Sequence, residues 1–290
     1  MKIAARCKKL GCVLFLFLFG VFVTPGCANL QTSPSRASQA HTASDDRLDA
    51  VLWQTTSAEY FVLAQSIYGA AKSHLERALA DRQWSALPAQ RENFQHLPTA
   101  VIMDIDETVI DTSRFQSLLI KNRVRSTRTL WRDWSRQNEP GRVPGAVEFV
   151  SFAQSHGVTV FFVTNRDHAT EPVTRNHLAA IGINLPDHID TVLSQSERPD
   201  WEADKASRRH FIAQSYRVLM LFGDDLGDFI SEYRTSAQAR MNEAMKHTEW
   251  GTKWFMLPNP MYGSWESSLY DFKSNLSMDE LSRRKFQQLR

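Results

Sequence analysis

Carboxylates occur at two places in the sequence where a short apolar run gives way to polar residues. Asp104 and Asp106 follow the run TAVIM, and Asp224 and Asp228 lie in the segment GDDLGDF, which follows VLMLF. Two carboxylates separated by one residue can place one oxygen against a phosphorus atom and the other near a leaving group. The second segment offers the hard oxygen ligands that Mg²⁺ takes. The pattern therefore predicts nucleophilic chemistry beside a magnesium site.

Two further positions carry groups suited to a phosphoryl group. Thr164, Asn165 and Arg166 follow the apolar run VTVFFV, where a hydroxyl and nearby backbone amides could hold a phosphoryl oxygen. Lys205, at the start of a predicted helix, is a point charge suited to that group and to an attacking carboxylate. Each residue alone has a structural alternative, because polar residues often only cap a helix or close a turn. Their occurrence together favours a catalytic site.

Strands and helices alternate along the chain. The apolar runs at residues 99–103, 158–163, 191–193, 218–222 and 254–257 are typical of buried parallel strands, and helices are predicted at 147–155 and 204–214. Residues 48–82 have apolar side chains at helical spacing and predict one long helix or two. This alternation predicts an α/β fold, a doubly wound parallel sheet covered on both faces. Ligands bind at the carboxyl ends of such strands, where the polar residues lie.

Six segments together resemble the class C bacterial acid phosphatases, the outer-membrane lipoprotein group of the haloacid dehalogenase (HAD) superfamily. They are DIDETVIDT, WRDWSRQNEPGRVPGAVEF, VTNRD, DKASRRHF, FGDDLGDF and NPMYGSWE, and the resemblance covers roughly residues 50–270. It implies a Rossmann-like phosphatase core at residues 97–258 with a smaller helical cap or side domain. The helices of residues 47–96 would contribute to the cap, and residues 259–290 would complete the pocket and side domain.

The resemblance also implies a mechanism. Asp104 would attack the phosphorus atom and form an aspartyl phosphate, and Asp106 would act as general acid and then as general base. Thr164 and Lys205 would orient and stabilise the transferring group. The expected ligands of Mg²⁺ are the Asp104 carboxylate, the backbone carbonyl of Asp106, and Asp224, with Asp228 either a further ligand or one water molecule removed.

Two aromatic residues could recognise the substrate. By the same resemblance, Trp131 and Tyr262 would line the pocket and stack on a nucleobase, which predicts activity on 5′-nucleotides of several bases. Packing in a hydrophobic core is the alternative for both, because the chain has eight Trp and 17 Phe residues. Asn165 and Arg166 would either fix their loop or contact substrate.

The sequence departs from the family at two positions. Asp225 stands where the family commonly has Asn, and Phe115 stands where it commonly has Tyr. The additional carboxylate could alter the metal affinity or the pH optimum, and we expect Asp225 to lie outside the metal ligands. The change at Phe115 should have little effect.

The N-terminus is typical of an exported lipoprotein. Residues 1–9 are basic, and the apolar run at 10–23 is shorter than the about 20 residues of a membrane span. We expect residues 1–26 to be a signal peptide, because VTPGC resembles a lipobox whose Cys27 becomes lipidated; plain cleavage nearby is the alternative. Ala28 then favours the outer membrane, on its periplasmic or surface face. Residues 27–46 predict a lipidated cysteine and flexible tether.

Charge and missing motifs exclude several other classes. Without residues 1–26, which hold four of the 34 Lys and Arg, the balance is 30 basic against 32 acidic residues, so a nucleic acid is not an expected partner. The chain has no GxSxG or HExxH motif, which argues against a serine hydrolase and a zinc site. Two alternatives stay open: a phosphotransferase of the same superfamily, and a surface lipoprotein with mainly a ligand-binding role.

Overall fold

The computed structural model describes residues 45–289, which belong to one compact unit. The predicted signal peptide, Cys27 and most of the predicted tether lie outside the described residues, so their assignment stays a prediction. Within the described range, no helix has both the length and the apolar composition needed to cross a membrane.

A five-stranded, fully parallel sheet forms the centre of this unit, in the order β5-β4-β1-β6-β7. The strands are β1 (Thr99–Met103), β4 (Thr159–Asp167), β5 (Val192–Gln195), β6 (Arg217–Gly223) and β7 (Trp254–Met256). Each coincides with one of the five apolar runs to within a few residues, which confirms the predicted α/β fold. Because β4 and β6 flank β1, their carboxyl ends lie together at one rim of the sheet.

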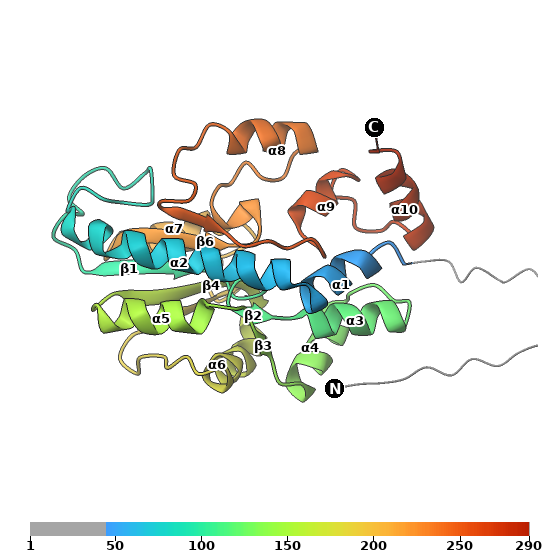
Figure 1. Cartoon of the computed structure of the whole chain (residues 1–290), viewed down its shortest axis with the longest axis horizontal. Helices are drawn as coiled ribbons and strands as arrows, with labels where there is room; N and C mark the ends of the chain where they lie inside the picture. The colour runs from blue at the N-terminus through green and yellow to red at the C-terminus, as the bar shows by residue number, and fades with distance from the viewer. Residues whose placement is uncertain (1–44, 290) are drawn as a thin grey trace, which may run out of the picture. The chain divides into compact units, whose positions relative to one another are not determined.

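Helices cover both faces of the sheet (Figure 1). They are α1 (Leu48–Thr56), α2 (Ala58–Ala80), α3 (Ser113–Lys121), α4 (Arg128–Gln137), α5 (Ala146–Ser155), α6 (Glu171–Ala180), α7 (Ala206–Ala213), α8 (Ala237–Ala244), α9 (Ser264–Ser268) and α10 (Met278–Phe286). Short 3-10 turns, η1 (His168–Thr170) and η2 (Leu226–Asp228), follow β4 and β6, and β2 (Ile110–Asp111) pairs antiparallel with β3 (Gly141–Arg142). The helical pattern at 48–82 forms two helices because Ser57 is extended and its hydroxyl caps α2 at the amide of Tyr60.

Alternate side chains of the central strand enter two separate hydrophobic cores. Val101 and Met103 pack in the core that includes Tyr68 of α2 and Phe149 of α5. Ala100 and Ile102 pack in the core on the other face, with residues of α7 and of the segment after η2. Since both faces are buried, the strands have continuous apolar sequences rather than alternating ones.

A small helical unit lies beside the carboxyl-end rim. Phe115 and Leu119 of α3 form a third hydrophobic cluster with Trp134 of α4. The two N-terminal helices serve different layers, because α1 contacts α3 whereas α2 covers the sheet together with α5. The domain boundaries given above stay predictions.

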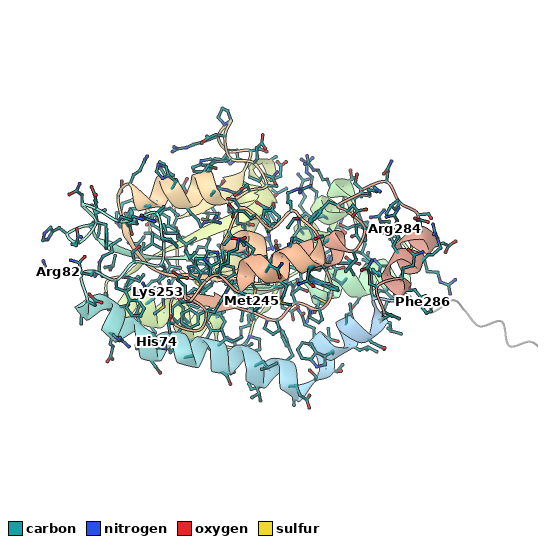
Figure 2. The ribbon with its side chains drawn as sticks, turned by 90° about the horizontal axis from the view of Figure 1, so that it is seen from above. His74, Arg82, Met245, Lys253, Arg284 and Phe286 are labelled. Carbon is teal, nitrogen blue, oxygen red and sulfur yellow. The ribbon has the colours of Figure 1, made fainter. Side chains whose placement is uncertain are left out.

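The C-terminal segment is held to this unit mainly by polar contacts. Arg125, in the connection between α3 and α4, donates to the carbonyl of Leu276 (2.6 Å). Lys285 of α10 forms ion pairs with Glu266 of α9 (2.5 Å) and with Asp46, just before α1 (3.1 Å). Helix α10 buries none of its residues, and its Phe286 is among the exposed large apolar side chains (Figure 2).

Candidate active site

Nine of the ten predicted site residues, all except Thr164, line one cavity at the carboxyl-end rim. The cavity has a volume of about 420 Å³. Its lining includes both aspartates of the DIDET segment, both predicted aspartates of the GDDLGDF segment, the two residues after Thr164, the lysine and both predicted aromatic residues: Asp104, Asp106, Trp131, Asn165, Arg166, Lys205, Asp224, Asp228 and Tyr262. The expected clustering at the ends of β1, β4 and β6 is therefore present.

Asp104 is buried against a single lysine. Lys205, which directly precedes α7, donates to Asp104 Oδ1 and forms an ion pair with Asp228 Oδ1 (2.6 Å). Burial raises the pKa of Asp104 to about 7, and the neighbouring Asp228 and Asp106 act in the same direction while Lys205 opposes them. Burial opposes the protonated form of Lys205, but Asp104 and Asp228 outweigh it and raise the lysine pKa.

Three carboxylates form a set suited to a metal ion. One oxygen each of Asp104, Asp224 and Asp228 lie within 4.8 Å of one another. Burial, followed by the charges of Asp104 and Asp228, raises the pKa of Asp224 well above its ordinary value. Three carboxylates against Lys205 leave a formal excess of two negative charges when all are ionised. A buried excess of this size and a set of hard oxygen donors fit a divalent cation.

Asp106 is engaged by Arg166. The Arg166 Nε lies 3.2 and 3.0 Å from the two Asp106 carboxylate oxygens, and Nη2 donates to Oδ1 (2.6 Å). The guanidinium also lies over the ring of Trp131 (5.2 Å) and contacts His177 Nδ1 (3.2 Å). His177 Nε2 contacts the carbonyl of Ser135 in α4 (2.8 Å). Burial and the Arg166 charge lower the pKa of His177, so the neutral ring can accept from the arginine.

Thr164 and Asn165 differ in their access to the cavity. Thr164 is buried, its Oγ1 accepts from the amide of Arg166 (3.1 Å), and it is not among the described residues that line the cavity. Asn165 lines the cavity and donates to the carbonyl of Ala203 (3.0 Å). Their predicted roles toward the phosphoryl group stay predictions.

Trp131 and Tyr262 lie between two cavities. Both line the cavity around Asp104 and a neighbouring one of about 340 Å³. Trp131 also packs against Phe115 and Trp134, with ring centroids 5.0 and 5.5 Å apart. The sequence left open whether Trp131 lines a pocket or packs against other apolar side chains. In the structure its side chain does both, while stacking on a nucleobase stays a prediction.

Asp225 also lines the cavity, but its carboxylate binds its own turn and the C-terminal segment and is not one of the three clustered carboxylates. Its Oδ2 accepts from the amide of Ser264 (2.5 Å), and its Oδ1 accepts from the Ser264 hydroxyl (2.5 Å) and the amide of Gly227 (2.9 Å). The Asp225 amide in turn donates to Asp228 Oδ2 (3.0 Å). Asp225 thus closes the turn that carries Asp228 and ties it to the N-terminus of α9.

Several residues around the site were not predicted. Thr108 Oγ1 donates to Asp224 Oδ1 (3.3 Å), and Asn259 Nδ2 donates to Asp224 Oδ2 (2.7 Å). Both lie in segments that carry the resemblance, DIDET and NPMYGSWE, so the spacing of these motifs was an available signal.

Glu107 follows Asp106, the predicted acid–base residue, and accepts several hydrogen bonds from buried groups. It is fully buried with a positive φ of 56°, and it accepts from Gln54 Nε2 of α1 (2.5 Å) and from the Tyr262 hydroxyl (3.3 Å). Burial raises the pKa of Glu107 to about 8, with the Asp111 charge acting in the same direction. The sequence contains no signal that pairs Gln54 with Glu107.

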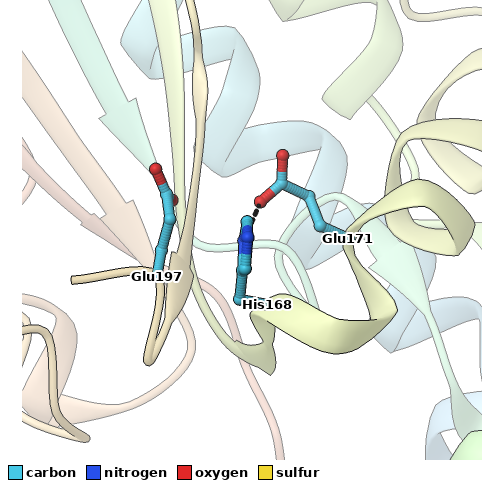
Figure 3. A group of neighbouring side chains, drawn as sticks. All are labelled: His168, Glu171 and Glu197. Atoms are coloured by element: carbon cyan, nitrogen blue, oxygen red, sulfur yellow. Dashed lines mark hydrogen bonds and ion pairs between the residues drawn. The ribbon is translucent and has the colours of Figure 1, made fainter. Parts of the chain in front are cut away.

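A second group with metal-ligating side chains consists of His168, Glu171 and Glu197 (Figure 3). Glu171 Oε2 contacts His168 Nδ1 (2.8 Å) and accepts from the Ser194 hydroxyl (3.0 Å). Glu171 Oε1 forms an ion pair with Arg175 (2.8 Å). Contacts within the chain therefore satisfy Glu171, and the Arg175 charge offsets it.

Comparison with known proteins gives one consistent result. Residues 27–265 match the family model described as HAD superfamily, subfamily IIIB (acid phosphatase). The structure is similar to that of the class C acid phosphatase from Bacillus anthracis, with 28% identity, a TM-score of 0.73, and coverage of 85% of this chain and 98% of that one. The tungstate-bound structure of the Bacillus anthracis class C acid phosphatase matches with 29% identity, a TM-score of 0.74 and coverage of 86% and 98%. The chain therefore belongs to the acid phosphatases of HAD subfamily IIIB, the class C acid phosphatases, and is a phosphomonoesterase.

Proposed function

We propose that this acid phosphatase depends on Mg²⁺, accepts 5′-nucleotides among its phosphomonoester substrates, and acts through an aspartyl phosphate on Asp104. The observation that carries this proposal is the buried cluster in which Lys205 joins Asp104 to Asp228, with Asp224 alongside. A lone lysine cannot balance three carboxylates, whereas a divalent cation together with Lys205 can.

The metal ion would be held by Asp104, Asp224, Asp228 and the backbone carbonyl of Asp106. When bound, it would supply positive charge that reduces repulsion between the phosphate dianion and the carboxylates. Mg²⁺ is the proposed ion because all of these donors are oxygen atoms.

The chain's own residues would perform the transfer. Lys205 fixes Asp104 through Oδ1 and places a positive charge beside the reacting carboxylate. Asp104 attacks the phosphorus atom, Asp106 protonates the departing oxygen, and Asp106 then takes a proton from the water that hydrolyses the aspartyl phosphate. Arg166 contacts both carboxylate oxygens of Asp106 and so positions the acid.

The adjoining cavities suit a substrate with a bulky leaving group. Trp131 and Tyr262 stand between them, so a phosphoryl group beside Asp104 would leave its nucleoside next to two aromatic side chains. Stacking on an aromatic face tolerates many bases. The Bacillus anthracis class C acid phosphatase has been solved with tungstate bound, a tetrahedral oxyanion like phosphate, which supports binding of a phosphoryl group by this enzyme.

The proposed location is the bacterial outer membrane, with a lipid anchor on Cys27. It rests on the basic and apolar N-terminus, the VTPGC segment and the polar tether. At the cell envelope, this enzyme would release phosphate and nucleosides from nucleotides. Metabolic labelling with a fatty acid would test the anchor, since the native protein should incorporate label and a Cys27→Ser variant should not. Label on both proteins, or on neither, would contradict it.

The catalytic proposal is tested by phosphate release from 5′-nucleotides and from an aryl phosphate, with Mg²⁺ and with a chelator. We expect activity only with the metal, and loss of activity in Asp104→Asn but not in Asp187→Asn, which alters an exposed carboxylate. Metal-dependent activity that survives in Asp104→Asn would refute Asp104 as the nucleophile. Added alcohols would reveal phosphoryl transfer to an acceptor other than water.

A further inference from the structure

Three cations at the start of α7 are buried beside the catalytic rim. The exposed fractions of Lys205, Arg208 and Arg209 are 5%, 0% and 6%. Arg208 and Arg209 lie three and four residues after Lys205, so all three project from the same side of the helix start. Burying a cation costs free energy unless the group is paired or hydrogen-bonded. Lys205 has carboxylate partners, whereas the two arginines donate mainly to backbone carbonyls.

Arg208 binds the loop that follows β4. Its Nη1 donates to the carbonyl of Thr164 (2.5 Å), and its Nη2 donates to Asn165 Oδ1 (2.7 Å) and to the carbonyl of Glu202 (2.7 Å). The planar guanidinium therefore joins the predicted phosphoryl-binding loop to the turn before α7. A lysine could not reproduce this contact, because its single nitrogen lacks the fork geometry.

Arg209 binds the loop that follows β6. Its Nη1 donates to the carbonyls of Gly227 (3.2 Å) and Asp228 (2.9 Å). The side chain of Asp228 is held independently, by Lys205 Nζ (2.6 Å) and by the amide of Asp225 (3.0 Å). Arg209 thus fixes the backbone that carries a proposed metal ligand.

The two arginines reach different loops because adjacent residues of a helix are about 100° apart around its axis. We infer that Arg208 and Arg209 are positioning residues with separate tasks: Arg208 sets the phosphoryl-binding loop, and Arg209 sets the metal-binding loop. This inference rests on the proposed function. It predicts that one substitution impairs oxyanion binding and the other impairs metal binding, although the residues are neighbours in the sequence.

The test compares Arg208→Lys and Arg209→Lys, which both keep the charge, with the native protein. Mg²⁺ binding is measured by calorimetry without substrate, and inorganic phosphate is measured as a competitive inhibitor at saturating Mg²⁺. For Arg209→Lys we expect about tenfold weaker Mg²⁺ binding, the lower end of the range for residues that orient metal ligands, and unchanged phosphate inhibition. For Arg208→Lys we expect about tenfold weaker phosphate inhibition and unchanged Mg²⁺ binding.

Equal effects of the two substitutions on both constants, or no effect on either, would overturn the inference while leaving the proposed function intact. If the native protein neither bound Mg²⁺ nor hydrolysed phosphomonoesters, both the proposed function and this inference would be wrong. Circular dichroism and thermal unfolding establish whether each variant is folded. Should a lysine variant not fold, Arg208→Gln or Arg209→Gln replaces it, because glutamine leaves no buried charge. The same two constants, for Mg²⁺ binding and for inhibition by phosphate, then support or overturn the inference.

Discussion

Asp225 stands where class C acid phosphatases commonly have Asn, and both of its carboxylate oxygens are engaged. Oδ1 accepts from the Ser264 hydroxyl and the amide of Gly227, and Oδ2 accepts from the amide of Ser264. In Asp225→Asn, one oxygen becomes an NH₂ group, whichever way the amide is turned. That group would face a backbone N–H, either of Ser264 or of Gly227. The substitution therefore loses a hydrogen bond and brings two donors together.

The expected cost follows from this geometry. A hydrogen bond to a charged acceptor contributes about 1.5–3 kcal/mol. In a domain of this size each kcal/mol corresponds to roughly 2–4 °C, so Tm should fall by about 3–12 °C. The Asp225 carboxylate is not among the clustered oxygens of Asp104, Asp224 and Asp228. We therefore expect kcat at saturating Mg²⁺ to stay close to that of the native protein.

Thermal and urea unfolding of Asp225→Asn test this prediction, with Asp187→Asn as the matched control. The control makes the same chemical change at an exposed carboxylate and should leave Tm unchanged. An unchanged Tm in Asp225→Asn would refute the stabilising role of the Ser264 contacts. A normal Tm combined with loss of metal binding would instead place Asp225 among the metal ligands.

Three further predictions concern the acid, the pocket and the pH dependence. Arg166→Gln removes the partner of Asp106, and turnover of a nucleotide should fall by about tenfold more than that of an aryl phosphate, because a good leaving group needs less protonation; steady-state kinetics measure the ratio. Trp131→Ala should raise KM for nucleotides by about tenfold through loss of base stacking, with unchanged inhibition by inorganic phosphate. Burial raises the pKa of Asp104 from 3.8 to about 7 in the metal-free protein, so the folded state holds a proton that the unfolded chain releases. The free energy of unfolding without metal should therefore fall as pH rises through this window, and Mg²⁺ should oppose the fall; urea titrations at pH 5 and pH 8 measure both.

Each of these predictions has a clear contrary result. Equal losses on both substrates in Arg166→Gln would mean that the arginine does not act through Asp106. An unchanged KM for nucleotides in Trp131→Ala would leave that residue a packing role alone. Metal-free protein that is more stable at pH 8 than at pH 5 would contradict the raised pKa of Asp104.

The fold could be predicted because the strands are buried on both faces. Their sequences are continuous apolar runs, and the polar residues that follow them must meet at one edge of a parallel sheet. Periodicity indicated the N-terminal helices but could not assign them to layers, since a helix covering the sheet and a helix packing on a cap both have one apolar face. The break at Ser57 depends on a cap that the pattern alone left open.

The contacts that complete the site were harder to predict from the sequence. Asn259 and Gln54 bond to carboxylates far away in the sequence, and such pairs depend on tertiary packing rather than on local spacing. The sequence left open whether Arg166 fixes its loop or binds substrate, and it gave no sign of the contact that Arg166 makes with Asp106. Arg208 and Arg209 lie in a segment that carries the resemblance, but nothing in the sequence shows which carbonyls they bind.

The most direct test of the central claim is to trap the covalent intermediate. The protein is mixed with Mg²⁺ and a phosphomonoester, quenched rapidly in acid, and mapped by peptide mass spectrometry. The account predicts one phosphoryl group on Asp104, absent without Mg²⁺ and absent in Asp104→Asn. A phosphoryl group on another residue, or full turnover by Asp104→Asn, would contradict it.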